Sequence, residues 1–199
     1  MEGALPRRPG SRRRAWRPRS LRCRPAGGRR ARRRTAARHG PAAGLGAVLA
    51  VETPEDLAAH VGTPIGPSPW RSVEEEKVIA FARLCGDDHW IHTDAKRAAR
   101  ETEFGGVIAQ GFLTLSMTTS MLGETFDVRR ASRWLNYGIE RLRFTGPVRA
   151  GDRVRLRGVL AAVEPARGGA TRIEIDLSVE AEGAAKPVLV ARSILLAFP

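Results

Sequence analysis

The segment that most constrains the fold of this chain is residues 108–123, which has the pattern of a helix that is apolar around most of its circumference. Its large apolar side chains are Phe112, Leu113, Leu115, Met117, Met121 and Leu122. The polar side chains of this segment are hydroxyls and one amide, so no face is strongly hydrophilic. A helix of this kind is buried rather than laid on a surface. The rest of the chain must therefore enclose it.

The hydrophobic period changes from 3.6 to 2 in the C-terminal part of the chain. Apolar and polar side chains alternate in residues 172–181 and in residues 153–160, and residues 134–144 and 188–198 are expected to form two more strands. Such alternation is typical of half-buried antiparallel strands. Helices followed by an antiparallel meander predict an α+β fold. Because one helix is too apolar for a surface, we expect the sheet to wrap around it.

The segment between the tail and the apolar helix predicts short helices joined by turns. Residues 72–75 have the pattern of a capping box, and the helix that follows should end at Gly86. Cys85 is expected to be a small buried residue of that helix. Residues 87–93 have no helical pattern and are expected to form a loop, after which Asp94 can cap a short helix.

The formal net charge of +13 is carried by the N-terminal tail. Residues 1–50 contain 15 Arg and one acidic residue, whereas residues 51–199 contain 19 Lys and Arg against 20 Asp and Glu. An Arg-, Pro-, Gly- and Ala-rich segment buries too little apolar surface to offset its ordering entropy, so we expect a disordered tail before a single domain at 51–199. A nucleic-acid-binding arm, a transit peptide and an export signal are alternatives for the tail. The interpretation we favour is that the tail is not part of the working protein.

Composition excludes several classes of protein. The near-neutral body argues against nucleic-acid binding by the folded domain. The longest apolar stretch, residues 42–51, is far shorter than the roughly 20 residues of a membrane-spanning helix. The 2 cysteines and 4 histidines are too few and too scattered for a disulfide framework or a structural zinc site. We expect a cytoplasmic protein without a metal ion.

Acidic and imidazole side chains gather just after the predicted helix end at Gly86. Asp87 and His92 are five positions apart in a turn, so both side chains can face one point. A carboxylate and an imidazole that face one water molecule can move a proton near neutral pH. Taken alone, this pattern is more typical of a solvated turn. Asp88 and Asp94 have the pattern of turn and cap residues.

Gly111 lies in the first turn of the predicted buried helix, where backbone N–H groups lack intrahelical partners. These groups and the helix dipole suit an oxygen atom that gains negative charge. Without a side chain, the residue leaves room for a thioester carbonyl. An alternative is that glycine lets the helix pass close beneath the sheet.

Three sequence blocks in this order resemble the MaoC-like hot-dog dehydratases, the (R)-specific enoyl-CoA hydratases or (3R)-hydroxyacyl-CoA dehydratases. The blocks are Gly-Asp-x-x-x-Ile-His-x-Asp at 86–94, Ile-Ala-x-Gly-Phe-Leu-Thr-Leu-Ser at 108–116 and Arg-Phe-x-x-Pro-Val-x-x-Gly-Asp at 143–152. The resemblance covers residues 51–199 and is nearest to the single-domain NodN-like branch. It implies a hot-dog fold, with an antiparallel sheet around a long helix. It also implies a homodimer formed through an exposed sheet edge.

The resemblance implies a role for four residues. Asp87 and His92 match the catalytic pair that activates the water added to C3 of a trans-2-enoyl thioester. Gly111 matches the residue whose backbone N–H holds the thioester carbonyl, and Thr119 falls where relatives often have a serine hydroxyl near the catalytic histidine. The implied reaction is reversible hydration of trans-2-enoyl-CoA to (3R)-3-hydroxyacyl-CoA. The substrate is a CoA or carrier-protein thioester, with no metal or redox cofactor.

The chain departs from the family pattern at two places, and two other functions remain open. His89-Trp90 stands where many relatives have Asn-Pro, and Gln110 stands where many have His. These departures bear on substrate preference and on the pH optimum. The alternatives are an acyl-CoA thioesterase on the same fold and a non-catalytic subunit that binds acyl thioesters. The intact pair of Asp87 and His92 favours catalysis.

Overall fold

The computed structural model describes residues 48–199, and most of the predicted tail lies outside this part of the chain. The helices are η1 (Glu55–His60, 3-10), α1 (Glu75–Cys85), α2 (Trp90–Thr93), α3 (Ala95–Glu101), α4 (Gly111–Leu122) and η2 (Arg167–Gly169, 3-10). The strands are β1 (Leu49–Val51), β2 (Pro64–Ile65), β3 (Arg71–Ser72), β4 (Phe126–Val128), β5 (Arg133–Phe144), β6 (Arg153–Pro165), β7 (Thr171–Ala181) and β8 (Leu189–Phe198).

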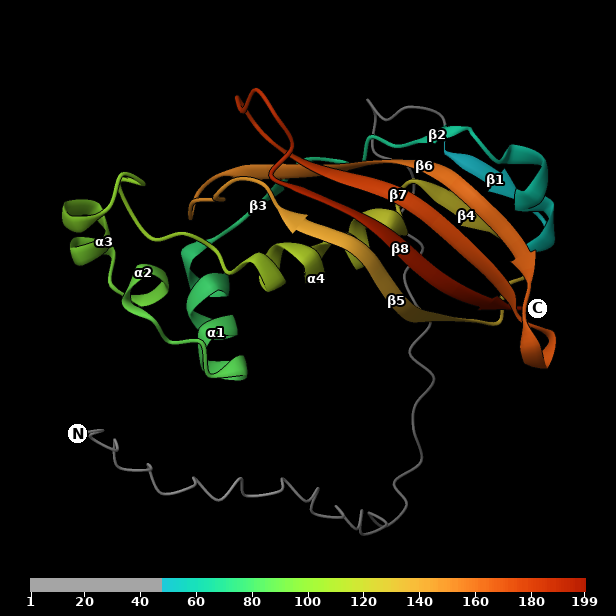
Figure 1. Ribbon diagram of the computed structural model, residues 1–199, viewed down its shortest axis with the longest axis horizontal. Helices are drawn as coiled ribbons and strands as arrows, with labels where there is room; N and C mark the ends of the chain where they lie inside the picture. Colours follow the sequence, from blue (N-terminus) through green and yellow to red (C-terminus); the bar gives the residue numbers. More distant parts are fainter. Residues whose placement is uncertain (1–47) are drawn as a thin grey trace, which may run out of the picture. The chain divides into compact units, whose positions relative to one another are not determined.

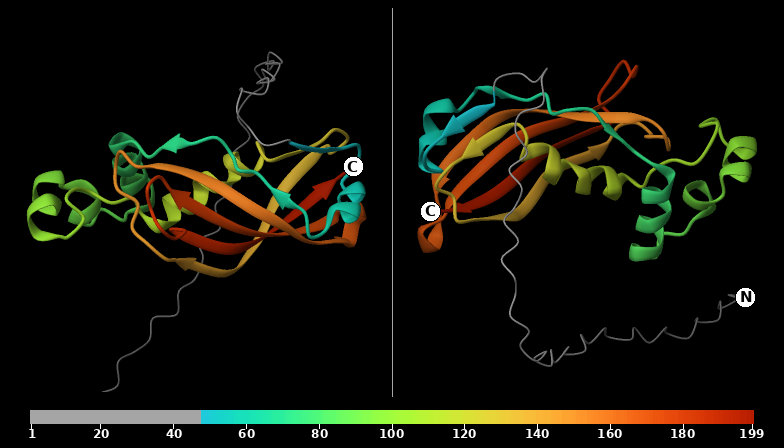
Figure 2. Two further views of the ribbon diagram at one scale, coloured as in Figure 1. Left: turned by 90° about the horizontal axis from the view of Figure 1, so that it is seen from above. Right: turned by 180° about the vertical axis from the view of Figure 1, so that it is seen from behind.

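A curved sheet of six strands forms the body of the domain. Its strand order is β2-β6-β7-β8-β5, with β3 also beside β6, and every pairing within it is antiparallel. Strands β1 and β4 form a separate parallel pair. The sheet lies over α4 (Figure 1), and two further views show the strands curving around this helix (Figure 2). This arrangement confirms the α+β prediction and is that of a hot dog.

The core lies between the concave face of the sheet and α4. Along β7 the buried side chains alternate with more exposed ones, as the period of two predicts, and Ile173, Ile175 and Val179 are fully buried. Helix α4 packs against β6 and β8, and its Met121 is fully buried. One side of the helix is not covered, because Phe112 is 63% exposed. In a single copy of the chain the predicted buried helix is thus covered on the side that faces the sheet and open at Phe112.

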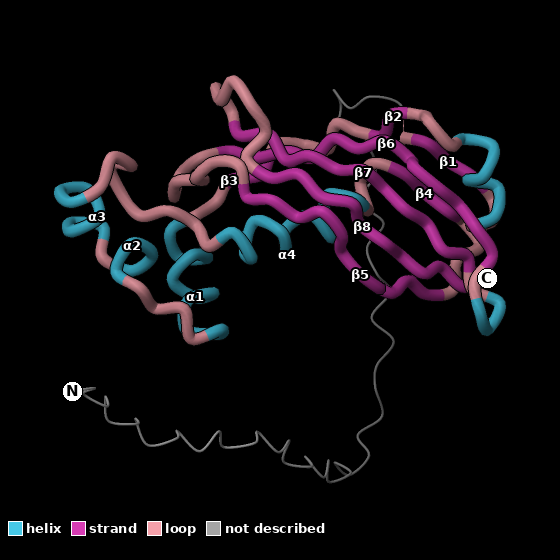
Figure 3. Tube along the Cα trace, in the orientation of Figure 1, coloured by secondary structure: helices cyan, strands magenta, loops and turns pink. Residues whose placement is uncertain are grey.

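Helices α1, α2 and α3 lie together beyond one end of the sheet, next to the N-terminal end of α4 (Figure 3). The predicted loop at residues 87–93 in fact contains the single turn α2. Cys85 is exposed rather than buried, since the C-terminal end of α1 lies away from the sheet. None of the helices between residues 48 and 199 has the length and apolar character that a membrane crossing requires.

Two N-terminal boundaries differ from those that the sequence predicted. Strand β1 begins at Leu49, so the ordered domain extends N-terminal of the predicted boundary at residue 51. Ser72 does not cap α1, because it belongs to β3 and pairs with Arg153 of β6. The N-cap of α1 is Glu74, whose side chain makes no capping hydrogen bond. A place in the sheet outweighs the local capping pattern, because the strand pairing satisfies more backbone groups than one cap does.

Strand β5 is the free long edge of the sheet, because β8 is its only partner strand in the described part of the chain. Most of its residues are exposed on both faces. The exposed large apolar side chains on this strand are Trp134, Leu135, Tyr137, Ile139 and Phe144. An exposed edge with apolar side chains is a surface for pairing with another chain.

Candidate active site

The single turn α2 places His92 at the N-terminal side of α4. A side chain caps the N-terminal end of this turn. The Nδ1 atom of His89 accepts a hydrogen bond from the Ile91 N–H at 3.5 Å. Asp94, which follows, accepts from the Arg97 N–H at 2.9 Å and caps α3, as predicted. His89 is thus used as a helix cap, and its ring is exposed.

The orientation of the His92 ring is fixed by one hydrogen bond. Its Nδ1 atom lies 2.6 Å from the carbonyl oxygen of Ile108. A carbonyl oxygen can only accept, so Nδ1 carries the hydrogen and donates it. In the neutral imidazole Nε2 is then an unprotonated acceptor. Since His92 is only 8% exposed, this acceptor has little contact with bulk solvent.

Asp87 approaches the same nitrogen from the turn that follows α1. Gly86 ends α1 in the left-handed region (φ 76°), and this turns the chain so that Asp87 faces α2. The Oδ2 atom of Asp87 lies 3.8 Å from Nε2 of His92, which is too far for a direct hydrogen bond. A water molecule that donates to two acceptors at about 2.8 Å each separates them by roughly 4.4 Å. A slightly bent arrangement therefore accommodates one water between the two groups.

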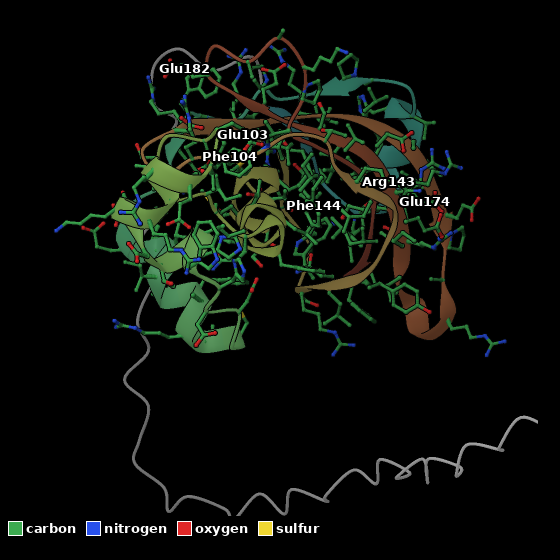
Figure 4. All side chains as sticks on the ribbon, turned by 60° about the vertical axis from the view of Figure 1, so that its left-hand side comes forward. Glu103, Phe104, Arg143, Phe144, Glu174 and Glu182 are labelled. Atoms are coloured by element: carbon green, nitrogen blue, oxygen red, sulfur yellow. The ribbon has the colours of Figure 1, made fainter. Side chains whose placement is uncertain are left out.

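A cavity of about 400 Å³ extends from His92 along the start of α4. Its lining includes His92, Phe104, Gly111, Thr114, Phe144 and Val148. Figure 4 shows Phe104 and Phe144, which come from the loop before α4 and from β5. Gly111 is the first residue of α4, so its N–H lacks an intrahelical partner. The cavity thus has mostly apolar walls, with an imidazole and a free backbone amide at one end.

The third sequence block holds the loop before α4 in place. Ala109 donates its N–H to the Val148 carbonyl at 2.7 Å, and Ala150 donates to the Val107 carbonyl at 3.0 Å. The carboxylate of Asp152 accepts from the Arg149 N–H at 2.8 Å and closes the turn that carries these groups. The position of the Gly111 amide therefore depends on a segment about 40 residues downstream.

The structure brings three of the four candidate residues together and separates the fourth. His92 and Gly111 line the same cavity, and Asp87 lies 3.8 Å from His92. Thr119 is exposed and lines a different cavity, of about 370 Å³, together with Trp134 and Asn136 of β5. It lies two turns further along α4 than Gly111. Thr114, which the sequence analysis did not select, lines the cavity of His92 instead.

Gln110 does not line the cavity of His92. Its Nε2 atom donates to the Val78 carbonyl of α1 at 3.4 Å, and the side chain is 2% exposed. The residue therefore joins the start of α4 to α1. It contacts the site through its neighbour Gly111.

Another cavity, of about 540 Å³, lies on the convex face of the sheet. Two of its arginines are already paired, Arg157 with Glu180 and Arg192 with Asp176. The charges of these two arginines are therefore balanced by carboxylates of the neighbouring strand. Within residues 48–199, the His, Cys, Asp and Glu side chains form no group of three or more that could hold a metal ion.

Comparisons with known proteins identify the family of this chain. The family model described as "MaoC like domain" matches residues 56–182. The 3-hydroxyacyl-thioester dehydratase Z of Mycobacterium tuberculosis is 40% identical over 144 residues, which cover 72% of this chain and 95% of that protein. Nodulation protein N of Rhizobium meliloti is 37% identical over 143 residues, or 71% of this chain and 89% of that protein.

Among solved structures, an R-hydratase from Pseudomonas aeruginosa superimposes with a TM-score of 0.56 at 25% identity, covering 69% of this chain and 81% of that one. The fold of the described residues and the matched family model lead to the same assignment. The chain belongs to the MaoC-like dehydratase family.

Proposed function

We propose that this protein is a hydro-lyase that adds water to C3 of a trans-2-enoyl-CoA to give a (3R)-3-hydroxyacyl-CoA, and that it also catalyses the reverse dehydration. The observation that carries the proposal is the separation of 3.8 Å between Asp87 Oδ2 and His92 Nε2, together with Gly111, the first residue of α4, in the lining of the same cavity as His92. The family membership and the relative named as a 3-hydroxyacyl-thioester dehydratase support the same reaction class.

The mechanism uses the pair to hold one water molecule. The water donates one hydrogen to the Asp87 carboxylate and the other to Nε2 of His92, which leaves an oxygen lone pair directed away from both acceptors. That lone pair attacks C3 of the enoyl thioester while one proton passes to the pair. The electrons of the C2–C3 double bond move toward the thioester oxygen, and the enolate-like intermediate takes the proton at C2. Water is thereby added with no net change of charge.

The Gly111 amide stabilises the charge that develops during this step. Its N–H lies at the positive end of α4, where an oxygen that gains negative charge is favoured. The apolar walls of the cavity take the first carbons of the acyl chain. Because the reaction moves only protons and a hydroxyl group, these residues need neither a metal nor a redox cofactor.

A homodimer joined through β5 is part of this proposal. The strand leaves an edge of backbone groups and a set of apolar side chains uncovered in one copy of the chain. The exposed Phe112 of α4 contacts the ring of Phe144 at the end of the same strand. Pairing of two β5 edges would bury the backbone groups of the edge and the apolar side chains of the strand. It would also continue the sheet from one copy into the next.

Crotonyl-CoA is the substrate that tests the proposal. The same substrate distinguishes a hydratase from a thioesterase and from a non-catalytic binding subunit. We expect the enoyl-thioester absorbance to fall as the substrate is hydrated, with (3R)-3-hydroxybutyryl-CoA as the product on a chiral column. Free thiol is measured in the same reaction. Thiol release without hydration would establish a thioesterase instead. Binding of crotonyl-CoA with neither reaction would establish a non-catalytic acyl-thioester-binding subunit.

A further inference from the structure

Thr114 lines the cavity of His92 and carries a buried hydroxyl group. The residue is 2% exposed, and its Oγ1 atom has no hydrogen-bond partner among the described residues. It lines the same cavity as His92 and Gly111. Buried hydroxyl groups are nearly always hydrogen-bonded, so an unpaired one that borders a cavity indicates that a ligand completes it.

Three other hydroxyl groups of α4 are bonded to the helix itself, and the remaining one, of Thr119, is on an exposed residue. Ser116 donates to the Phe112 carbonyl at 2.8 Å, Thr118 to the Leu115 carbonyl at 2.6 Å, and Ser120 to the Met117 carbonyl at 3.1 Å. These bonds to the preceding turn are the usual way in which a helix satisfies a serine or threonine hydroxyl. Thr114 makes no such bond, although the carbonyl of Gln110 lies one turn before it.

Thr114 lies on the same face of α4 as Gly111, one turn further along the helix. Side chains on a helix lean toward its N-terminus, and residues three apart lie on one face. Thr114 therefore covers the turn that begins at Gly111. Gly111, Thr114 and His92 all line this cavity.

We propose that the Thr114 hydroxyl donates a hydrogen bond to the thioester carbonyl oxygen, as a second donor beside the Gly111 N–H. This inference rests on the proposed function, in which that oxygen gains negative charge as C3 is attacked. Sites that stabilise such an oxygen place donors where the charge develops, and two donors at one oxygen hold its position better than one. The carbonyl in turn satisfies a hydroxyl that the folded chain leaves unpaired.

The test compares Thr114→Val with Thr114→Ser, and uses Thr118→Val as the matched control. Both valine variants put the same β-branched, apolar side chain at a buried threonine of α4, but the Thr118 hydroxyl is already bonded to the helix. We expect Thr114→Val to lower kcat for crotonyl-CoA hydration about 10²-fold with a smaller change in KM. Thr114→Ser should retain most of the rate, and Thr118→Val should retain nearly all of it. Thermal unfolding of each variant checks that the fold is kept.

The possible results separate this inference from the proposed function. If the wild type hydrates crotonyl-CoA and the two valine variants have the same kcat, the role of Thr114 is wrong while the function stands. If the wild type does not hydrate crotonyl-CoA, the proposed function is wrong, and calorimetric titration with butyryl-CoA then decides the role of the hydroxyl. Weaker binding by Thr114→Val than by Thr118→Val supports the contact, and equal Kd values overturn it.

Discussion

Gly111 and Phe144 approach each other so closely that a Cβ atom at position 111 would lie 2.7 Å from Cγ of the phenylalanine ring. Phe144 is the last residue of β5 and Gly111 is the first of α4. The contact sets how closely the start of the helix approaches the edge of the sheet. It favours the interpretation that glycine allows this close passage, and the same position presents the backbone amide to the cavity.

Replacing Gly111 with alanine should therefore affect stability and activity together. The added methyl group must displace the Phe144 ring or the first turn of α4, and overpacking of this kind costs about 1–3 kcal/mol in the free energy of unfolding. We expect Gly111→Ala to unfold at lower urea concentration and to hydrate crotonyl-CoA at least 10-fold more slowly, since the amide moves. A variant as stable and as active as the wild type would contradict the contact.

A second substitution separates the two roles of Gly111. In Gly111→Ala/Phe144→Leu the smaller side chain makes room for the methyl group, so we expect the free energy of unfolding to recover toward that of Phe144→Leu alone. The hydration rate should stay low, because the methyl group still borders the amide that receives the carbonyl. Full recovery of the rate in the double variant would mean that Gly111 is needed only for packing.

The pattern of apolar residues was enough to predict the layers of this fold, but not the residues at which its helices and strands begin and end. The helix predicted at 108–123 begins at Gly111, because Ile108 forms an isolated bridge with Arg149 and stays extended. The short strand β3 was missed, since Ser72 has a local capping pattern and only its pairing with β6 reveals the strand. Periodicity reports which face of an element is buried. It does not report which distant segment pairs with the ends of that element.

The sequence likewise predicted one part of the candidate site and missed another. Asp87 and His92 are close in sequence and lie in one short turn, so their approach could be predicted. The resemblance gave Thr119 as the hydroxyl near the site, whereas the structure places Thr114 on the cavity of His92. A run of hydroxyl residues on one helix does not reveal which of them lacks a partner. That depends on the rotation of α4 under the sheet.

Positive charge introduced on β5 should dissociate the proposed homodimer into monomers. Leu135→Lys/Ile139→Lys places two ammonium groups on the exposed edge strand, where pairing would bury them without partners. By sedimentation equilibrium we expect the wild type to have twice the chain mass of 21.7 kDa and the variant to have the mass of one chain. Val61→Lys, at an exposed apolar residue after η1, is the control and should remain dimeric. A monomeric wild type would exclude the interface.

Low pH should remove the stabilisation of the fold by the ion pair of Asp176 and Arg192 on the convex face of the sheet. The two oxygens of Asp176 accept from Nε and Nη2 of Arg192 at 2.7 and 2.6 Å. Hydrogen bonding to Arg192, and then its charge, hold the pKa of Asp176 below its ordinary value. Because the folded-state pKa is lowered, the stabilisation is present above the unfolded value of about 3.9 and is lost as the pH falls through the folded value.

Asp176→Asn should accordingly lower the free energy of unfolding at pH 7 by no more than about 1 kcal/mol, since the carboxylate is half exposed. The difference from the wild type should shrink as the pH falls below about 4. Urea unfolding of both proteins over this pH range measures it, with Asp88→Asn, an exposed carboxylate after α1, as the control. A difference that is the same at every pH would contradict the assignment to the ion pair.

The most direct test of the mechanism is a double-mutant cycle on Asp87 and His92 with crotonyl-CoA hydration as the readout. Each of Asp87→Asn and His92→Ala should lower kcat about 10²–10⁴-fold, the range for loss of a working acid or base. The double variant should be hardly slower than the slower single variant, because both residues act on one water molecule. Asp88→Asn, the neighbouring carboxylate, should keep the wild-type rate. Near wild-type kcat in either single variant, or losses that multiply in the double variant, would contradict a shared water between these two side chains.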